Sequence, residues 1–325
     1  LDYSTGAEAF LLEPQSTNLF TYSEDISVFA SASNGTGTNP VITSNYSVSP
    51  DGTQNADRIQ FNRGSGTSSN DTSYVTYGLS LGTIDATLSI YLKTNDGTTK
   101  DVTLRLGASL FDYDVTITSN WQRFTLSGNT NIDRVQILLY GNQNSQTADI
   151  SCYGIQLEQQ SYATSYIPTS GASATRNQEL CNNATPVINS EEGTLYFEIS
   201  ALADDLTYRS ISISNNTAQN QLLMEYEGVT NKFRVYLAVS NNIDGLISVT
   251  INTTQNNKIA YKYAENNLAL WINGVEVGSF TGTKAMMAAN TMTNLSFTRG
   301  NNTQPFFGNT KGLKYYPKAL ADVQL

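Results

Sequence analysis

Apolar and polar residues alternate along most of this chain. Successive side chains of a β-strand point to opposite faces, so a period of two predicts strands with one buried face. The segments with this pattern are 57–61, 86–93, 102–106, 121–126, 134–140, 150–157, 194–199, 209–213, 232–239, 247–251, 258–263, 268–272 and 313–316. Turns rich in Gly, Asn, Asp and Ser separate them, and the one predicted helical turn lies near residues 319–325. The pattern predicts an all-β protein built from antiparallel β-sandwiches.

The pattern stops between residues 161 and 193, a stretch with two prolines and many small residues. We interpret it as a connector whose first half is held to the preceding domain by Tyr162, Tyr166 and Ile167. The blocks on either side each have about the size of one sandwich. The predicted organisation is a lead-in at 1–17, a first sandwich at 18–170, a linker at 171–189 and a second sandwich at 190–325.

The chain opens at Leu1, and an apolar stretch follows in the sequence LLEPQSTNLFTYSED at positions 11–25. We predict that Phe10–Leu12 is a docking strap leading in from an upstream segment. Phe20 and Tyr22 are then expected to start the first sandwich. The chain is expected to be a fragment of a longer polypeptide.

Composition narrows the choice of partners. The net charge is −10, only 14% of the residues are charged, and no cluster of Lys and Arg stands out. Nucleic acid and anionic membranes are therefore poor partners. The apolar runs, such as Ile137–Leu139, are too short to cross a bilayer.

The sequence contains no histidine. This excludes Ser-His-Asp and Cys-His catalysis and zinc sites with histidine ligands. Cys152 and Cys181 are too few and too distant in sequence for a metal site. Two unlinked thiols are the preferred interpretation, with a single disulfide as the alternative.

Motifs in the second block resemble those of a known fold family. The series comprises Leu195-Tyr196-Phe197-Glu198, Arg209-Ser210-Ile211-Ser212, Asn273-Gly274, Phe306-Phe307-Gly308 and Ala319-Leu320-Ala321-Asp322. It resembles a concanavalin A-like (laminin-G-like) sandwich, and most closely the lectin-like module that recurs in phage tail and fibre proteins. The resemblance implies a second β-sandwich over nearly all of this block.

The first block carries its own ordered series. It runs from Asn18-Leu19-Phe20 through Ser49-Pro50-Asp51-Gly52 and Trp121-Gln122-Arg123-Phe124 to Gln156-Leu157-Glu158 and Tyr166-Ile167-Pro168-Thr169. It resembles the carbohydrate-binding-module-like jelly roll that precedes the lectin-like module in phage virion proteins. The implied fold is a jelly roll followed by a concanavalin A-like sandwich.

The two tryptophans receive different predictions. Trp121 opens an alternating strand, and large aromatic residues are mostly buried, so we expect it in the core. In the segment 268–272, Leu268, Leu270 and Ile272 share one face, which directs Trp271 to the other. We expect Trp271 to serve as a subunit contact or as a platform for a glycan.

Tyrosines supply the other candidate ligand residues. Tyr74 and Tyr77 are three residues apart and must point to opposite faces, so we expect one of them in the core. Tyr74, Tyr91, Tyr113 and Tyr140 are the candidates for contact with a sugar, because tyrosine is suited to adaptable polar recognition.

Acidic residues were considered for metal binding and for catalysis. The resemblance places Asp149 where related jelly rolls carry a structural calcium ligand, although one Asp fixes no other ligand. No other cofactor is expected. The nearest carboxylate pairs are Glu191/Glu192, Asp204/Asp205 and Glu225/Glu227, and their spacing cannot show whether any of them faces a cleft. The active-site motifs of glycan hydrolases with a concanavalin A-like fold, such as E-x-D-x-E, are missing, so we expect no enzyme activity.

The expected function is adhesion. The resemblance implies a segment of a phage virion fibre or tail protein, outside the cell on the particle, that binds host surface polysaccharide. It would associate with other virion proteins and form a homotrimer, whose repeated weak contacts add through avidity. The alternative is a secreted bacterial lectin, or an accessory carbohydrate-binding module attached to a glycan-active enzyme.

Overall fold

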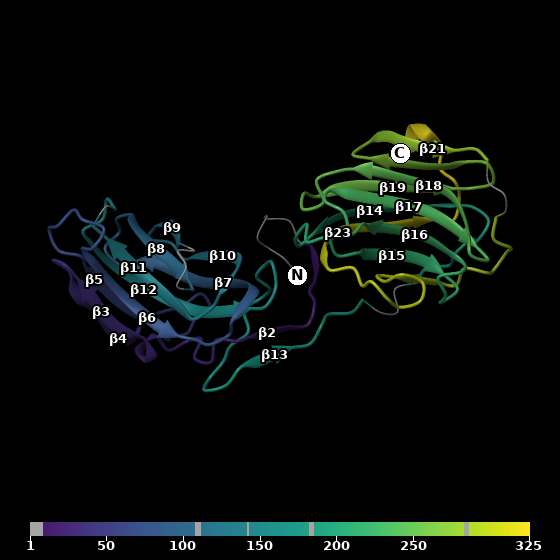
Figure 1. Cartoon of the computed structure of the whole chain (residues 1–325). Coiled ribbons are helices and arrows are strands. Elements are labelled where there is room, and N and C mark those ends of the chain that lie inside the picture. Colours follow the sequence, from purple (N-terminus) through teal and green to yellow (C-terminus); the bar gives the residue numbers. More distant parts are fainter. Residues whose placement is uncertain (1–8, 108–111, 142, 182–184, 283–285) are drawn as a thin grey trace. The chain divides into compact units, whose positions relative to one another are not determined.

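The computed structural model describes residues 9–107, 112–141, 143–181, 185–282 and 286–325. It is an all-β protein, as predicted, and its strands form antiparallel β-sandwiches (Figure 1). Two compact units result: the first sandwich, Gln15–Asn177, and the second sandwich, Leu1–Pro14 together with Gln178–Leu325. The described helices are the short 3-10 turns η1 (Ile26–Val28) and η2 (Asp322–Gln324), and no helix in the described residues is long and apolar enough to span a membrane.

The first sandwich has two five-stranded sheets. The β7 sheet contains, in spatial order, β10 (Gln122–Asn131), β7 (Thr83–Thr94), β12 (Thr147–Glu158), β5 (Ala56–Asn62) and β4 (Thr38–Ser47). The β6 sheet contains β3 (Ala30–Asn34), β6 (Thr72–Gly78), β11 (Arg134–Tyr140), β8 (Lys100–Leu106) and β9 (Asp112–Ile117). The short strands β2 (Ser16–Asn18) and β13 (Ala174–Arg176) pair with each other.

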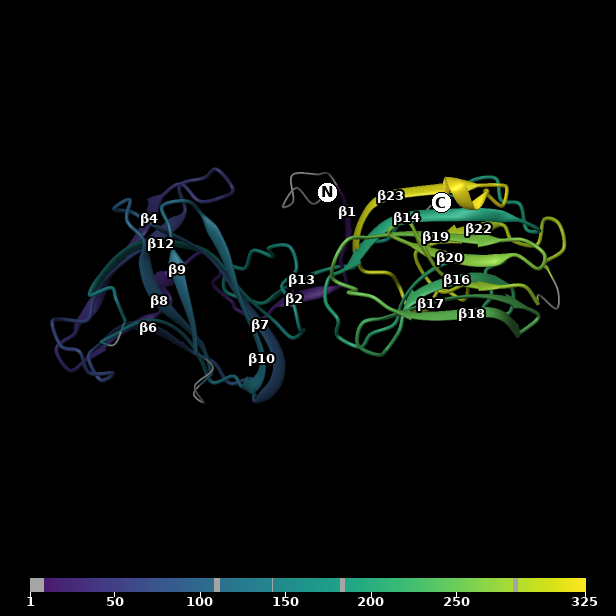
Figure 2. The same ribbon diagram turned by 90° about the horizontal axis from the view of Figure 1, so that it is seen from above.

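The second sandwich is built from a six-stranded and a five-stranded sheet. The β14 sheet contains β1 (Phe10–Leu12), β23 (Gly308–Tyr316), β14 (Gly193–Ala201), β19 (Asn257–Tyr263), β20 (Leu268–Ile272) and β21 (Val275–Phe280). The β16 sheet contains β18 (Asn242–Thr250), β17 (Lys232–Val239), β16 (Gln221–Tyr226), β15 (Arg209–Ser214) and β22 (Asn294–Ser296). Figure 2 shows strands of the two sheets as separate layers.

Each core follows from the alternation of the sequence. In β11, Val135, Ile137 and Leu139 are buried between the sheets of the first sandwich, and the residues between them face outward. In β20, Leu268 and Leu270 fill the core of the second sandwich. One face of each strand therefore builds the core, and the other faces away from it.

The segment Phe10–Leu12 pairs with β23 and so forms an edge strand of the second sandwich. Leu12 is buried in the core of that sandwich, whereas Phe10 is exposed. The connector is held to the first sandwich where predicted: the Tyr166 hydroxyl donates to Ser23 Oγ (2.7 Å), and Ile167 is buried. The turn predicted near the last residues is η2.

Candidate functional site

The outward face of the β6 sheet gathers aromatic and polar side chains. On β11, Gln136, Leu138 and Tyr140 alternate with the core residues. Tyr74 of β6 lies directly beside Leu138 in the sheet register. On the other side of β11, the pairing with β8 places Arg105 next to Gln136. Residues distant in sequence thus form one continuous surface.

Two adjoining hollows cover this face, with volumes of about 670 Å³ and about 560 Å³. Both are lined by Tyr140 and Ser69, so we treat them together as the β6 groove. The larger hollow adds Tyr74, Arg105 and Arg134. Each volume lies within the usual range of small-molecule sites, about 300–1,000 Å³.

The groove has an apolar floor. Leu138 is only 2% exposed, yet it lies outside the core cluster and lines the larger hollow. Tyr74 and Tyr140 line the same hollow beside it. Two tyrosines next to a sheltered leucine form an apolar patch surrounded by polar groups.

A hydrogen-bonded cluster fixes Tyr140. Arg105 donates to Asp112 through Nε (2.5 Å) and Nη2 (2.8 Å), and to Gln136 Oε1 (3.2 Å). Arg105 also contacts the Tyr140 hydroxyl, which donates to Asp112 Oδ2 at 3.2 Å. The cluster is closed on itself, so the Tyr140 ring is held in one orientation.

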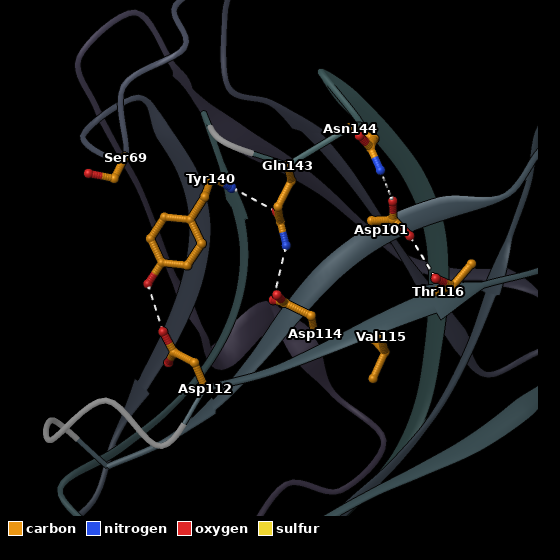
Figure 3. Close-up of a pocket in the computed structure, with 9 residues that line it drawn as sticks. All are labelled: Ser69, Asp101, Asp112, Asp114, Val115, Thr116, Tyr140, Gln143 and Asn144. Atoms are coloured by element: carbon orange, nitrogen blue, oxygen red, sulfur yellow. Dashed lines mark hydrogen bonds between the residues drawn. The ribbon is translucent and has the colours of Figure 1, made fainter.

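The smaller hollow is lined by paired polar groups (Figure 3). The Gln143 side chain accepts from the Tyr140 backbone N–H (2.9 Å) and donates to Asp114 Oδ1 (3.3 Å). Asn144 donates to Asp101 (3.1 Å), which also accepts from Thr116 (2.7 Å). Amides and carboxylates are the groups that hydrogen-bond to hydroxyls, so the lining is chemically suited to a ligand with hydroxyl groups.

Arg63 holds together the two loops that form the rim of the groove. Its guanidinium donates to the main-chain carbonyls of Gly66 (2.5 Å), Gln143 (3.1 Å) and Ser145 (3.0 Å). Arg63 is 8% exposed. It thereby connects the loop that carries Ser69 with the loop that carries Gln143.

Asp71 fixes the first of these loops from within. Its carboxylate accepts from the backbone N–H of Thr36 (2.8 Å) and of Ser68 (2.9 Å), and from the Thr36 hydroxyl (3.0 Å). The hydrogen bonds from Thr36 are the main cause that lowers the pKa of Asp71. The carboxylate therefore stays charged and keeps the rim ordered.

Of the four predicted tyrosines, the structure brings two together. Tyr74 and Tyr140 both line the groove. Tyr77 packs on Phe20 with ring centroids 4.7 Å apart, which confirms that Tyr74 and Tyr77 point to opposite faces. Tyr113 is exposed, but it pairs in register with the core residue Leu104, so it points away from the groove face.

Tyr91 lies in the other sheet of the first sandwich. Its ring is 6.2 Å from that of Tyr153, which is in turn 5.3 Å from Tyr166. Gly154, at φ +64°, allows this packing, because a Cβ there would lie 3.3 Å from the rings of both Tyr91 and Tyr166. Tyr91 thus packs beside the tyrosine that anchors the connector.

Trp271 faces outward from the β14 sheet, as its strand position predicts. It is nevertheless only 5% exposed, because it packs with Ala260, Ala269 and Leu325. The Lys262 ammonium lies 4.9 Å from the ring centre. The expectation of an indole open to a glycan or to a second subunit does not fit this burial, since the chain covers its own tryptophan.

The prediction for Trp121 was also wrong, because this residue is more exposed than expected. We expected it in the core, but it is half-buried, and its Nε1 donates to the Val48 carbonyl (3.1 Å). Phe124 and Leu126 pack with the core, which places Trp121 with Arg123 on the outward face. The Lys93 ammonium lies 5.0 Å from the ring centre.

Asp149, the predicted calcium ligand, lies within β12 and pairs with an arginine. Arg58 contacts both of its carboxylate oxygens, with Nε 2.8 Å from Oδ1, and Asn95 donates to Oδ1 at 2.8 Å. The hydrogen bond from Arg58 is the main cause that lowers the pKa of Asp149. A calcium ion would have to displace this guanidinium. Within the described residues, no group of three or more His, Cys, Asp or Glu side chains is arranged to hold a metal.

Among the described residues, five of the six carboxylates considered for catalysis, all except Glu191, form other contacts. Arg234 Nε donates to Glu225 (2.6 Å), and its Nη1 lies 3.6 Å from Glu227. Asp205 pairs with Arg209, Asp204 accepts from a backbone N–H, and so does Glu192. Cys152 and Cys181 are free thiols.

The second sandwich fills the outward face of its β16 sheet with its own chain. The Thr298 carbonyl accepts from Ser212 (2.8 Å), and the Gly300 N–H donates to Gln221 (3.0 Å). Both sheet residues are fully buried. This face therefore does not compete with the β6 groove as a site.

Sequence reasoning missed the arginines and the floor of the groove. Arg63 and Arg105 carry no motif, and Leu138 lies within the apolar run Ile137–Leu139, which was considered only as too short to cross a bilayer. The alternation of side chains along β11 was the available signal. Leu138 shares its face with the polar residue Gln136 and with Tyr140, while Ile137 and Leu139 occupy the core face.

Comparisons with known proteins give likenesses of fold. No protein-family model matches the sequence, and no curated protein matches it. The carbohydrate-binding module CBM40 of a Ruminococcus gnavus IT-sialidase, solved with α2,6-sialyllactose, is 15% identical, with 42% of this chain and 81% of that chain covered and a TM-score of 0.36. The heptameric SAP-like pentraxin of Limulus polyphemus is 15% identical (43% and 70% covered, TM-score 0.34). Domains LG4-5 of the mouse laminin α1 chain are 10% identical (79% and 92% covered, TM-score 0.29). At these TM-scores the likenesses carry no argument about function, which rests on the groove.

Proposed function

We propose that this chain is a non-enzymatic carbohydrate-binding protein whose ligand occupies the β6 groove. The observation that carries the proposal is the apolar patch of Leu138, Tyr74 and Tyr140, set among fixed amides, carboxylates and guanidinium groups.

A sugar ring matches the groove in two ways, through its apolar C–H face and through its hydroxyl groups. Its C–H face packs on the electron-rich face of an aromatic ring, and its hydroxyls need several donors and acceptors at fixed positions. Gln136, Gln143 and Asn144 supply amides, while Asp112 and Asp114 supply acceptors. Because these groups already bond one another, little conformational entropy is lost on binding.

The test is a screen of the whole chain against immobilised bacterial surface polysaccharides, followed by calorimetry with the strongest binder. Tyr74→Ala and Tyr140→Ala should each weaken binding roughly three- to tenfold, since an aromatic contact contributes about 0.5–1.5 kcal/mol. Tyr113→Ala is the matched control and should bind as the wild type does. Equal losses for Tyr113→Ala and Tyr140→Ala would contradict the assignment of the groove.

For the biological setting, we propose a segment of a phage virion fibre or tail protein that attaches to host polysaccharide as a homotrimer. The support is the ordered motif series in both blocks, which resembles virion proteins. Avidity would compensate for weak single-site binding. Light scattering after size exclusion tests the trimer, and neighbouring genes for virion structural proteins would support the setting.

A secreted bacterial lectin, or an accessory module of a glycan-active enzyme, is the second candidate. The β6 groove supports this candidate as well as it supports the virion protein, because a single site on one sandwich can bind a glycan without a multimer. Neighbouring genes for polysaccharide use, together with a monomeric mass, would favour this candidate over the virion protein.

A further inference from the structure

A second and chemically different hollow lies at the edge of the second sandwich. It has a volume of about 360 Å³ and is lined by residues of the paired strands β1 and β23, together with Cys181 and Phe297. Leu12, Phe297 and Leu313 form apolar walls, and the exposed Phe10 borders it. A sugar would leave its hydroxyls without partners against such walls, so this hollow does not fit a glycan.

Two polar groups in the hollow point to the kind of ligand that fits. Thr310 is 6% exposed, and its hydroxyl oxygen has no hydrogen-bond partner among the described residues. Lys311 is the one charged residue that lines the hollow within the described part of the chain, and it forms no ion pair there. An apolar cavity with one cation and one unsatisfied hydroxyl suits a ligand with a long apolar part and a small anionic head.

The hollow also contains a thiol. Cys181 lines it together with Leu12 and Phe297, and the same three residues line a neighbouring hollow of about 340 Å³. Cys181 is a free, half-buried thiol, whereas Cys152 is 1% exposed in the first sandwich. Cys181 therefore reports on occupancy of this hollow.

We propose that this hollow, beside the paired strands β1 and β23, binds a medium-chain aliphatic carboxylate. The alkyl chain lies along Leu12, Phe297 and Leu313, and the carboxylate faces Lys311. This site is separate from the β6 groove and does not depend on glycan binding.

The probe is sodium decanoate, kept below its micelle threshold and added to the whole chain. Binding is measured by calorimetry and by the rate at which Cys181 reacts with a thiol reagent. Decanoate should slow the reaction, and Cys181→Trp, which fills the hollow, should weaken binding about tenfold or more. Lys311→Met should weaken decanoate binding about threefold and leave binding of the uncharged 1-decanol unchanged, as expected for a partly exposed ion pair. Lys258→Met, on the exposed side of β19, is the matched control.

Three results would overturn the proposal. One is unchanged Cys181 reactivity at saturating decanoate in a folded protein. Another is decanoate affinity that survives Cys181→Trp. The third is protection of Cys181 by anionic phospholipid vesicles and not by decanoate, which would assign this edge to membrane contact. Circular dichroism of each variant separates loss of binding from loss of fold.

Discussion

The guanidinium of Arg63 donates a hydrogen bond to the main-chain carbonyl of Gln143, 3.1 Å away and 80 residues further along the chain. The contact joins one rim loop of the β6 groove to the other. It makes the shape of the groove depend on a residue that lines neither hollow.

Arg63→Lys should weaken glycan binding almost as much as Arg63→Gln. Lysine keeps the charge but cannot reach three carbonyls in different directions, as the planar guanidinium does. Lost hydrogen bonds to a charged group should lower the free energy of unfolding of the first sandwich by about 3 kcal/mol. Calorimetry and urea unfolding measure both effects. Wild-type affinity in Arg63→Lys would show that charge, and not geometry, is what matters.

Trp271→Ala should destabilise the second sandwich without affecting glycan binding. Truncating a buried tryptophan costs about 3–5 kcal/mol, and the indole is closed off by Leu325 and Lys262. Thermal unfolding and the polysaccharide assay together test this. Trp121→Ala, at a half-buried position, should cost clearly less. A loss of glycan affinity in Trp271→Ala with the fold intact would restore the tryptophan as a ligand residue.

Asp149→Asn should change how stability responds to acid. The Arg58 contact holds the pKa of Asp149 below its usual range, so the folded state binds fewer protons there than the unfolded state does. The stabilisation is complete above the unfolded pKa, about 3.9, and is lost as the pH falls through the lower folded pKa. The wild type should therefore exceed Asp149→Asn by about 1 kcal/mol or less at neutral pH, since the pair is partly exposed, and by nothing in strong acid.

Urea unfolding across this pH range measures the difference. Asp85→Asn is a suitable control, because Asp85 is exposed and forms no ion pair among the described residues. An advantage of the wild type that is the same in strong acid and at neutral pH would contradict the assignment to the Arg58 pair.

Leu12→Ala should destabilise the second sandwich and leave the first unchanged. Leu12 is 6% exposed in the core of the second sandwich, and such a truncation costs about 2–5 kcal/mol. Phe10→Ser, at a position 66% exposed, should change stability by about 0.5 kcal/mol or less. Unfolding followed by probes specific to each sandwich distinguishes the two. Equal destabilisation of both sandwiches by Leu12→Ala would contradict this placement of β1.

The sequence predicted the parts of the molecule that depend on local alternation. Strands such as 134–140 and 268–272, the two faces of β11 and the opposite orientations of Tyr74 and Tyr77 all follow from a period of two. The local pattern could not show what covers a face. Trp271 is buried by Leu325, 54 residues away in sequence. This burial depends on how the segment that contains Leu325 packs on the β14 sheet. The rim of the groove likewise depends on Arg63, whose partners belong to loops that no pattern joins.

The pairing of Phe10 with Thr310 across 300 residues constrains the order in which the protein folds. The first sandwich is continuous in sequence and is completed early in synthesis, so it can fold while the rest of the chain is still being translated. The strand β1, translated before it, has to wait for β23, and closing so long a loop is slow. During that interval Leu12 has no core to enter. A β23 edge in a neighbouring chain would offer Leu12 the same partner, which is the geometry from which strand exchange starts.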